Sequence, residues 1–269
     1  MILRYGKPQA RHYVMQLLDY VWGIFPAQAS LFLIIALWQW VHNQMGAMIM
    51  PAPLAVFERI GEILSSVEYQ EVFKTVWRGG LGVLLAVVTG SCLGFLAGIS
   101  QTLALLLRPI NTLLLGIPPI IWIVLAIFWF YMGDLSVIFT VWIVVLPLCF
   151  SAAQMSLRTV PNSLLEMVRV YKIPFSRQLT QLYIPHILRQ MLPALIVAIG
   201  TGLKVTVMAE LLGASDGMGS KIGDARAMLE TTDVMAYVSL ILLISMGIEY
   251  GILEPIRRYF IQGESYAKT

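Results

Sequence analysis

GGLGVLLAVVTGSCLGFLAGIS, residues 79–100, contains no charged side chain along its whole length. A helix needs about 20 consecutive apolar residues to cross the hydrocarbon of a bilayer. Gly90, Gly94 and Gly98 recur at every fourth position, a spacing that lets two membrane helices approach closely. The stretch therefore predicts a transmembrane helix with one closely packed face.

The composition extends this prediction to the whole chain of 269 residues. Hydrophobic residues make up 58% of it and charged residues only 12%, whereas soluble domains carry about 25% charged residues. The apolar runs are too long and too uniformly apolar for the alternating strands of a membrane barrel. The sequence predicts an all-α integral membrane protein with six spans, and their ranges are 28–44, 79–100, 109–131, 135–156, 191–213 and 234–254.

The loop charges indicate an orientation, because Lys and Arg are more frequent in cytoplasmic loops. With the N-terminus inside, most basic residues of the loops lie in the cytoplasm. Both termini and the segment 157–190 are then cytoplasmic. The predicted organisation is a cytoplasmic N-terminal segment 1–27, a transmembrane domain 28–260 that includes 157–190, and a cytoplasmic tail 261–269. The basic residues assigned to the outside are Arg59, Lys74, Arg78, Lys221 and Arg226.

Residues 163–193 form a polar, basic island between two apolar runs. Apolar residues at helical spacing predict a short amphipathic helix, which should end near Lys172 because Pro174 disfavours helical backbone before it. A second short helix is predicted to follow, with Ser176 as its cap. Two interpretations stay open: a helix pair on the lipid surface, or a helix inserted into a groove of a soluble partner.

Three ionisable residues fall within predicted spans, where they are costly and usually face a cavity or a partner. Lys204 and Glu210 lie in the fifth span and Glu249 lies in the sixth. Six residues apart, Lys204 and Glu210 are not neighbours on one helix. Lys204 either lines a translocation path, pairs with Glu249 or extends toward the interface. Glu210 is either structural or part of an external gate.

Two further features concern the third and fifth spans. The pair Pro118-Pro119 predicts a break in the third span, because proline removes a backbone donor. Trp122 either packs or lines a pore. Asp134 is expected to be a solvated or capping acid before the fourth span. The glycines after the fifth span predict either a flexible gate loop or a tight turn, and these are Gly213, Gly217 and Gly219.

Catalysis is not indicated. The chain lacks a Gly-rich segment ending in Gly-Lys-Ser/Thr, so it is not itself an ATPase. Its histidines have no metal-ligand spacing, and no cofactor is expected to bind this chain. Cys92 and Cys149 fall in predicted spans and are interpreted as small buried apolar residues.

Four motifs in order resemble one family. They are MPAPLAVF at 50–57, TVWR at 75–78, IPPIIWIVLAIFWFYMGDLSVIF at 117–139 and AELLGASDGMGSKIGDAR at 209–226. The chain is similar, over roughly residues 50–260, to permeases of binding-protein-dependent ABC importers with the type I fold, in the nitrate/sulfonate/taurine-type subfamily.

The cytoplasmic island resembles the coupling loop of these permeases, which reads Glu-Ala-Ala, a Gly, then Ile/Leu-x-Pro or Leu-Pro. Glu166, Met167 and Val168 stand at Glu-Ala-Ala, and Ile184-Pro185 supplies the downstream part. Lys172 occupies the position of the family Gly, and Pro174 supplies the break. The resemblance implies that an ATPase subunit is contacted by Glu166, Met167, Val168, Arg169, Lys172 and Pro174.

The resemblance also implies partners and a location. Two copies of the chain would form the channel in a bacterial inner membrane, on two ATPase subunits that bind ATP and Mg, with an external solute-binding protein and no nucleic acid. The path or gate would involve Lys204, Glu210 and Trp122. The solute would be a sulfonate-, taurine- or nitrate-like anion, or an aromatic vitamin precursor. The alternatives are an ion-gradient-driven carrier and a non-transporting scaffold.

Overall fold

The structure is a computed structural model that describes residues 13–253 and 255. These residues form helices joined by short turns, with no strand among them. The chain divides into two compact units, residues 1–58 and 59–269, and each is described by itself. The start of the predicted N-terminal segment and the predicted tail 261–269 lie outside the described residues.

The first unit is dominated by α1 (Tyr13–Met45), which contains the whole predicted span 28–44. The chain then reverses at Gly46, whose φ of +78° favours glycine. Two side chains of α1 fasten the segment that follows. Trp38 Nε1 donates to the carbonyl of Pro51 at 3.0 Å, and His42 Nδ1 lies 2.6 Å from the carbonyl of Met50. The unit ends within α2 (Pro53–Ser65).

The second unit is built around α3 (Tyr69–Ile99) and α6 (Asp134–Arg158), which pack along their lengths. The predicted glycine face of α3 is confirmed. A Cβ atom at Gly90 would lie 2.7 Å from the carbonyl oxygen of Leu146, and one at Gly98 would lie 2.9 Å from Leu157 Cδ1. Cys149 is buried in this contact, whereas Cys92 is exposed, contrary to the prediction that both are buried.

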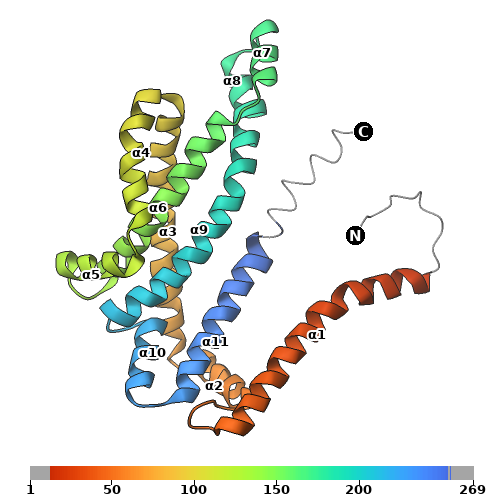
Figure 1. Cartoon of the computed structure of the whole chain (residues 1–269), viewed down its shortest axis with the longest axis vertical. Coiled ribbons are helices and arrows are strands. Elements are labelled where there is room, and N and C mark those ends of the chain that lie inside the picture. Colours follow the sequence, from red (N-terminus) through yellow and green to blue (C-terminus); the bar gives the residue numbers. More distant parts are fainter. Residues whose placement is uncertain (1–12, 254, 256–269) are drawn as a thin grey trace. The chain divides into compact units, whose positions relative to one another are not determined.

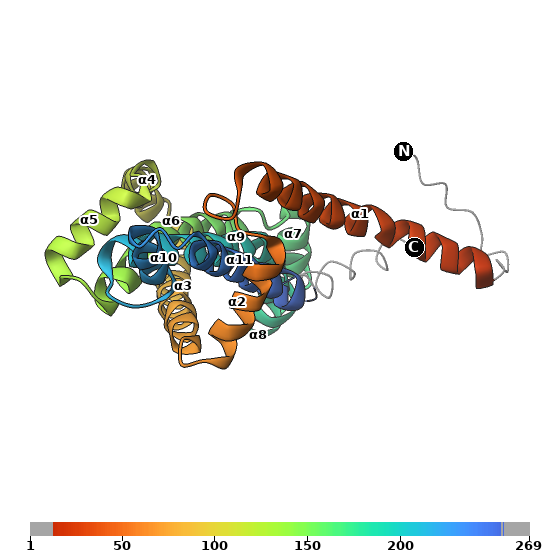
Figure 2. The same cartoon turned by 90° about the horizontal axis from the view of Figure 1, so that it is seen from below.

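The third predicted span is broken at Pro118, as expected. Its residues fall in α4 (Gln101–Gly116) and α5 (Pro119–Phe130), whose axes differ by 97°. The helix α4 begins at Gln101, before the predicted start at 109. Figures 1 and 2 show α5 turning away from α4 at the edge of the second unit. The fixed φ of proline suits the first turn of α5, and its missing N–H costs nothing there.

The polar island 163–193 contains most of α7 (Asn162–Val170), as predicted, but the second helix is not separate. The short α8 (Phe175–Gln178) continues through a π-helical turn, η1 (Leu179–Tyr183), into α9 (Ile184–Gly213). Together they form a helix of 39 residues. The predicted cap at Ser176 is wrong, because Pro174 occupies the N-cap position. Pro185 does not end this helix. It follows the π-helical turn Leu179–Tyr183, where the regular hydrogen-bond pattern of the α-helix is already interrupted.

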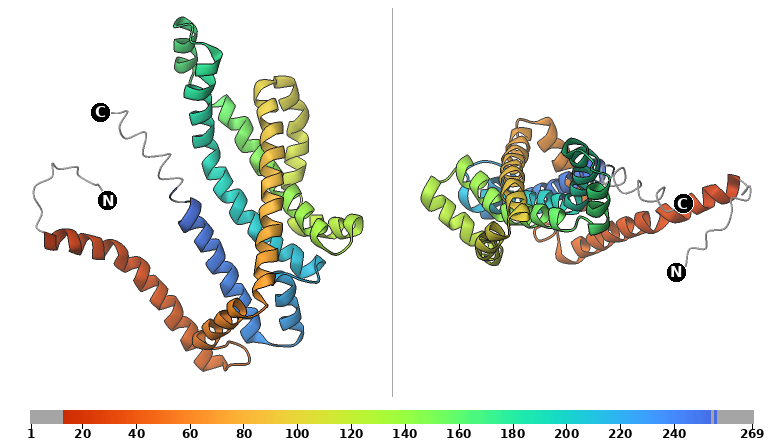
Figure 3. Two further views of the ribbon diagram at one scale, coloured as in Figure 1. Left: turned by 180° about the vertical axis from the view of Figure 1, so that it is seen from behind. Right: turned by 90° about the horizontal axis from the view of Figure 1, so that it is seen from above.

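The chain finishes with α10 (Met218–Ala227), α11 (Thr231–Ile248) and a π-helical turn, η2 (Glu249–Leu253). Within the second unit, α7 and α8 lie at one end of the bundle and α10 lies at the other (Figures 1 and 3). The core between these ends joins α3, α6 and α9, and it includes Ala86, Val145 and Ala198.

Four helical segments of the described residues are long and apolar enough to cross a membrane. Their ranges are Tyr69–Ile99, Asp134–Arg158, Phe175–Gly213 and Thr231–Gly251. The bent pair α4–α5 is a fifth when counted as one span. In the described part of the chain α1 is not among them, so the sixth span remains a prediction.

Candidate functional site

At the α10 end of the bundle, Arg78 joins four parts of the second unit. Its side chain is 4% exposed and leaves α3 directly before the uncharged run 79–100. Nη1 donates to Glu210 Oε1 at 3.0 Å and to the backbone carbonyl of Asp216 at 2.9 Å. Nε donates to Asp134 Oδ1 at 2.7 Å. One buried cation therefore holds α3, α6, α9 and the loop before α10 together.

Glu210 is the buried anion of this cluster, with no exposed side-chain surface. Besides Arg78, its carboxylate accepts from Thr75 Oγ1 at 2.7 Å and from the backbone N–H of Gly219 at 3.1 Å. A buried carboxylate is costly unless it is paired and hydrogen-bonded. Glu210 meets both conditions, so it is a fixed structural element at this end of the bundle.

The loop before α10 is fixed rather than flexible. Lys74 Nζ donates to Asp216 Oδ2 at 2.8 Å, and the N–H of Gly217 donates to Glu71 Oε2 at 2.5 Å. Hydrogen bonds from Lys74, and then from Arg78, lower the pKa of Asp216 below its ordinary value. Gly217 has a φ of +99°, and a Cβ atom there would collide with the carboxyl group of Glu210. Of the two predicted behaviours, the structure shows the tight turn.

Asp134 is both solvated and paired. Its side chain is 69% exposed, which agrees with the predicted solvated acid, yet it also accepts from Arg78. Gly133, the residue before it, donates its N–H to the carbonyl of Gly213 at 3.0 Å. The start of α6 is therefore tied to the end of α9 as well as to α3.

A second ionic cluster joins α2 to the start of α11. Arg59 donates through Nε and Nη2 to both carboxylate oxygens of Asp233, at 2.8 and 2.9 Å. Its Nη2 also lies 3.1 Å from Glu68 Oε2, which accepts from the hydroxyl of Tyr237. The hydrogen bond to Asp233 raises the pKa of Arg59 above its ordinary value. This planar, two-bond arrangement fixes the position of α11.

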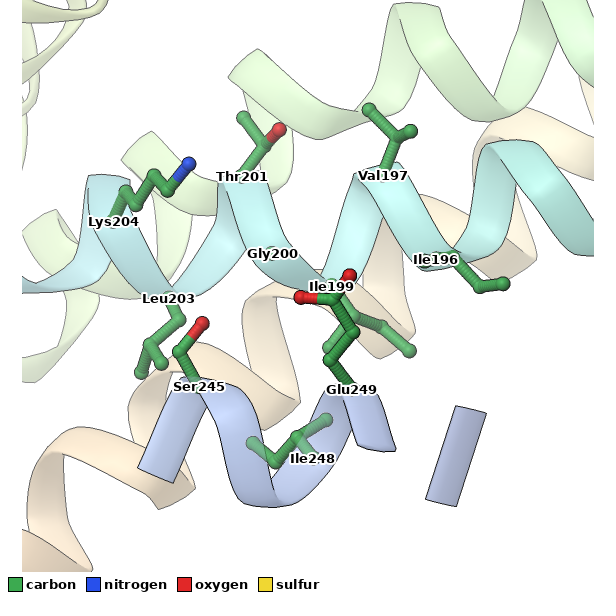
Figure 4. A pocket seen from close by; sticks show the side chains of 10 residues that line it. All are labelled: Ile196, Val197, Ile199, Gly200, Thr201, Leu203, Lys204, Ser245, Ile248 and Glu249. Carbon is green, nitrogen blue, oxygen red and sulfur yellow. The ribbon is translucent and has the colours of Figure 1, made fainter. Parts of the chain in front are cut away.

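A cavity of about 240 Å³ lies between α9 and the end of α11 (Figure 4). Lys204 and Glu249 both line it, and both residues are exposed. No ion pair within 4.0 Å joins these two residues in the described structure, so the predicted alternative of a Lys204–Glu249 bridge is not what it shows. The remaining lining residues are Ile196, Val197, Ile199, Gly200, Thr201, Leu203, Ser245 and Ile248.

Trp122 stands apart from these groups. It lies on α5 and is half-buried, and it does not line the cavity that holds Lys204. Its indole Nε1 is buried and has no hydrogen-bond partner among the described residues. The structure therefore does not bring the three predicted path residues together. Nor do the described residues contain a group of His, Cys, Asp or Glu suited to a metal ion.

The predicted coupling helix α7 has an exposed side and an anchored side. Glu166, Met167 and Arg169 are exposed, as is Pro174 in the turn after the helix. Val168 is buried at 8% exposure, so it anchors α7 to its own chain.

Lys172 ends α7 in a left-handed conformation, with a φ of +48°. The N–H of Ile173 donates to the carbonyl of Val168 at 3.1 Å, and that of Lys172 donates to the carbonyl of Arg169 at 3.3 Å. This pair of hydrogen bonds is the Schellman termination, whose left-handed position is usually glycine. The lysine thus adopts the backbone conformation that the family glycine would adopt without strain.

Large apolar side chains are exposed beside this turn. Val170, Tyr171 and Phe175 are 76%, 75% and 70% exposed. They are flanked by exposed Arg169 and Arg177. Large exposed apolar side chains with charged neighbours are typical of a site that binds another protein.

Sequence reasoning found Glu210 but missed the residues that hold it. Arg78 was assigned only to an outside loop. A signal was present, because Thr75 and Arg78 are the ends of TVWR, and Glu210 and Asp216 belong to the motif at 209–226. The two motifs form one cluster, but nothing in their spacing along the chain indicates this.

Comparison with known proteins places these features in a family context. The profile of "Binding-protein-dependent transport system inner membrane component" matches residues 90–253. The chain is 29% identical to the putative aliphatic sulfonates transport permease protein SsuC of Bacillus subtilis, covering 76% of this chain and 75% of that protein. It is 25% identical to the taurine transport system permease protein TauC of Escherichia coli, covering 78% of each.

A solved structure shares the fold. A chain of the MetNI methionine ABC transporter superposes with a TM-score of 0.61 at 18% sequence identity, covering 70% of this chain and 94% of that one. The helical arrangement described above is therefore one already seen in an ABC transporter.

Proposed function

This chain belongs to the family of binding-protein-dependent transport system inner membrane components, and we propose that two copies of it form the transmembrane pathway of an ATP-driven importer. Two ATPase subunits, which bind ATP and Mg, would supply the energy. An external solute-binding protein would deliver the solute.

The observation that carries the proposal is the exposed surface of α7 and the turn after it. This surface lies at the opposite end of the bundle from α10 (Figure 1). An amphipathic helix with unpartnered apolar side chains suits a groove in a soluble partner. Glu166, Met167 and Arg169 would contact the ATPase, Val168 would hold the helix to the bundle, and Lys172 with Pro174 would set its end.

The topology follows from the loop charges. We place both termini and residues 157–190 in the cytoplasm, and count α1 and the bent pair α4–α5 as spans, which gives six. The transmembrane domain is then 28–260, between the segment 1–27 and the tail 261–269. The ionic cluster around Arg78 lies on the outside, where the binding protein docks.

The pathway would pass the cavity between α9 and α11. Lys204 is exposed in that cavity, where an ammonium group would attract a negatively charged solute. Glu210 would act as a fixed closure of the outer end rather than as a contact for solute. Trp122 would adjust the packing of α5 beside the path. The sulfonate and taurine systems of its relatives favour a small organic sulfonate over an aromatic solute.

The experiment is co-purification of the chain with its ATPase subunit, together with ATP-dependent uptake in proteoliposomes. Reversing both charges in Glu166→Lys/Arg169→Glu should abolish co-purification and uptake. The matched control is Lys221→Glu/Asp224→Lys, which reverses another pair three residues apart, on α10. It should retain the ATPase.

Two outcomes would contradict the proposal. Retention of the ATPase by the α7 variant at the wild-type level would remove the coupling role of α7. Uptake by the purified chain without ATP would instead support an ion-gradient carrier, and a complex that moves no solute would support a scaffold.

A further inference from the structure

The cavity between α9 and α11 carries one positive and one negative side chain that do not neutralise each other. Lys204 comes from α9 and Glu249 from η2, and both line the same space of about 240 Å³. A charged group within a membrane span is expensive unless it meets a partner or water. Since no ion pair joins these two in the described structure, each has unsatisfied capacity to bind a solute.

The side chains around the cavity are arranged about Gly200 (Figure 4). The Glu249 carboxylate and the Ser245 hydroxyl are directed from α11 and η2 toward α9. In this view Lys204 and Thr201 leave α9 on the side away from Ser245 and Glu249. Hydroxyl groups of Thr201 and Ser245 therefore accompany the two charges, and apolar side chains complete the lining.

Packing does not account for glycine at position 200. A Cβ atom built there meets no atom within 4 Å, whereas one at Gly202, two residues on, would collide with Val83. Glycine within a helix costs stability relative to alanine. An open position between opposite charges is consistent with space kept for a bound solute.

We propose that this cavity is a solute site selective for a small zwitterion, with its anionic group at Lys204 and its cationic group at Glu249. The inference rests on the proposed function and narrows its solute class. A simple anion such as nitrate would satisfy Lys204 but leave the carboxylate of Glu249 to repel it. An aminosulfonate such as taurine, or an amino acid of similar length, satisfies both groups.

The test is binding to the intact complex of this chain with its ATPase subunits in lipid nanodiscs, without the solute-binding protein. Isothermal titration would use taurine and β-alanine as zwitterions, ethanesulfonate as the anion without the amine, ethylamine as the cation, and nitrate. Each zwitterion should bind at least about tenfold more tightly than the single-charge probes, since a charge-assisted hydrogen bond contributes that much.

The variants test which residue binds which charged group of the solute. Glu249→Gln should reduce taurine affinity to that of ethanesulfonate and leave ethanesulfonate binding unchanged or improved. Lys204→Gln should abolish ethanesulfonate binding and spare ethylamine. Gly200→Ala should fold and couple to the ATPase normally but weaken zwitterion binding about tenfold, because its methyl group occupies the cavity and not the packed core. Glu230→Gln, outside the cavity, is the control.

The proposal is overturned if ethanesulfonate or nitrate binds as tightly as taurine, if neither zwitterion binds, or if the charge variants leave the ratios unchanged. Basal ATP hydrolysis by the same complex separates this failure from failure of the proposed function. A complex that hydrolyses ATP and imports solute but shows no such selectivity refutes only the zwitterion site.

Discussion

Arg78 Nη1 lies 3.0 Å from Glu210 Oε1, so a cation of α3 and an anion of α9 form an ion pair with almost no exposure to solvent. Both residues belong to apolar helices, where an isolated charge is costly. Removing one partner of a buried pair leaves the other uncompensated, whereas removing both is often tolerated. This asymmetry makes the pair a sensitive probe of packing at the α10 end of the bundle.

Arg78→Met should destabilise the protein by about 3 kcal/mol, because Glu210 then stays buried without its cation. The double variant Arg78→Met/Glu210→Gln should recover part of that loss, since the amide oxygen of the introduced glutamine can still accept from Thr75. Thermal unfolding in detergent measures both. Arg226→Met, an exposed change on α10, should alter stability by less than about 0.5 kcal/mol. Equal loss in the single and double variants would contradict the coupling.

The glycine face of α3 gives a second prediction. Gly94→Ala should cost about 2 kcal/mol, because the added methyl group would collide with the backbone of Phe150 on α6. Gly80 lies on the same helix, but a Cβ atom there meets nothing within 4 Å. Gly80→Ala should therefore be neutral or stabilising by up to about 1 kcal/mol. Melting temperatures that fall equally in the two variants would refute the packing argument.

The left-handed conformation of Lys172 gives a third. Lys172→Gly should relieve strain of about 1 kcal/mol at the end of α7 and slow amide exchange of Ile173. Lys172→Ala is the matched control, since it removes the charge and keeps the Cβ atom. Hydrogen–deuterium exchange distinguishes the two. If Lys172→Ala slows amide exchange of Ile173 as much as Lys172→Gly does, the charge of the lysine, and not its backbone conformation, destabilises the turn.

The lowered pKa of Asp216 predicts a pH dependence. Its contribution to stability is fully present above the ordinary pKa of 3.8 and is lost as the pH falls through the lower pKa of the folded state. Wild type should exceed Asp216→Asn in melting temperature by a constant margin from neutral pH down to about 4, and the margin should vanish in stronger acid. Asp224→Asn, a surface change, should show little difference at any pH. A margin that grows on acidification would reverse the predicted sign.

Much of the fold could be predicted because local rules dominate a membrane chain. The absence of charge over 79–100 follows from the cost of polar groups in lipid. The break before α5 follows from the backbone donor that proline lacks. The second island helix was mispredicted for a specific reason. A second short helix was expected after Pro174, but η1 joins α8 to α9, and this π-helical turn has no signal in the local sequence pattern.

The candidate site was predictable only in part. The motif at 209–226 contains Glu210, the fifth apolar run contains Lys204, and the island contains the coupling residues. The motifs TVWR, at 75–78, and AELLGASDGMG, which begins at 209, lie far apart in the sequence. The two motifs come into contact around Arg78 because α3, α6 and α9 pack together at this point. Likewise Lys172 could be identified as occupying a glycine position, but its conformation depends on the hydrogen bonds that close α7.

The sequence by itself determined that the protein is helical, lies in a membrane, has a basic island between two apolar runs and resembles importer permeases. Those properties depend on composition and on short-range spacing. Only the tertiary structure decided the surroundings of each charge: Arg78 and Glu210 form a buried ion pair, whereas Lys204 and Glu249 line one open cavity without pairing. The physical reason is that a charge's energy depends on neighbours from other helices and on solvent access, and packing sets both.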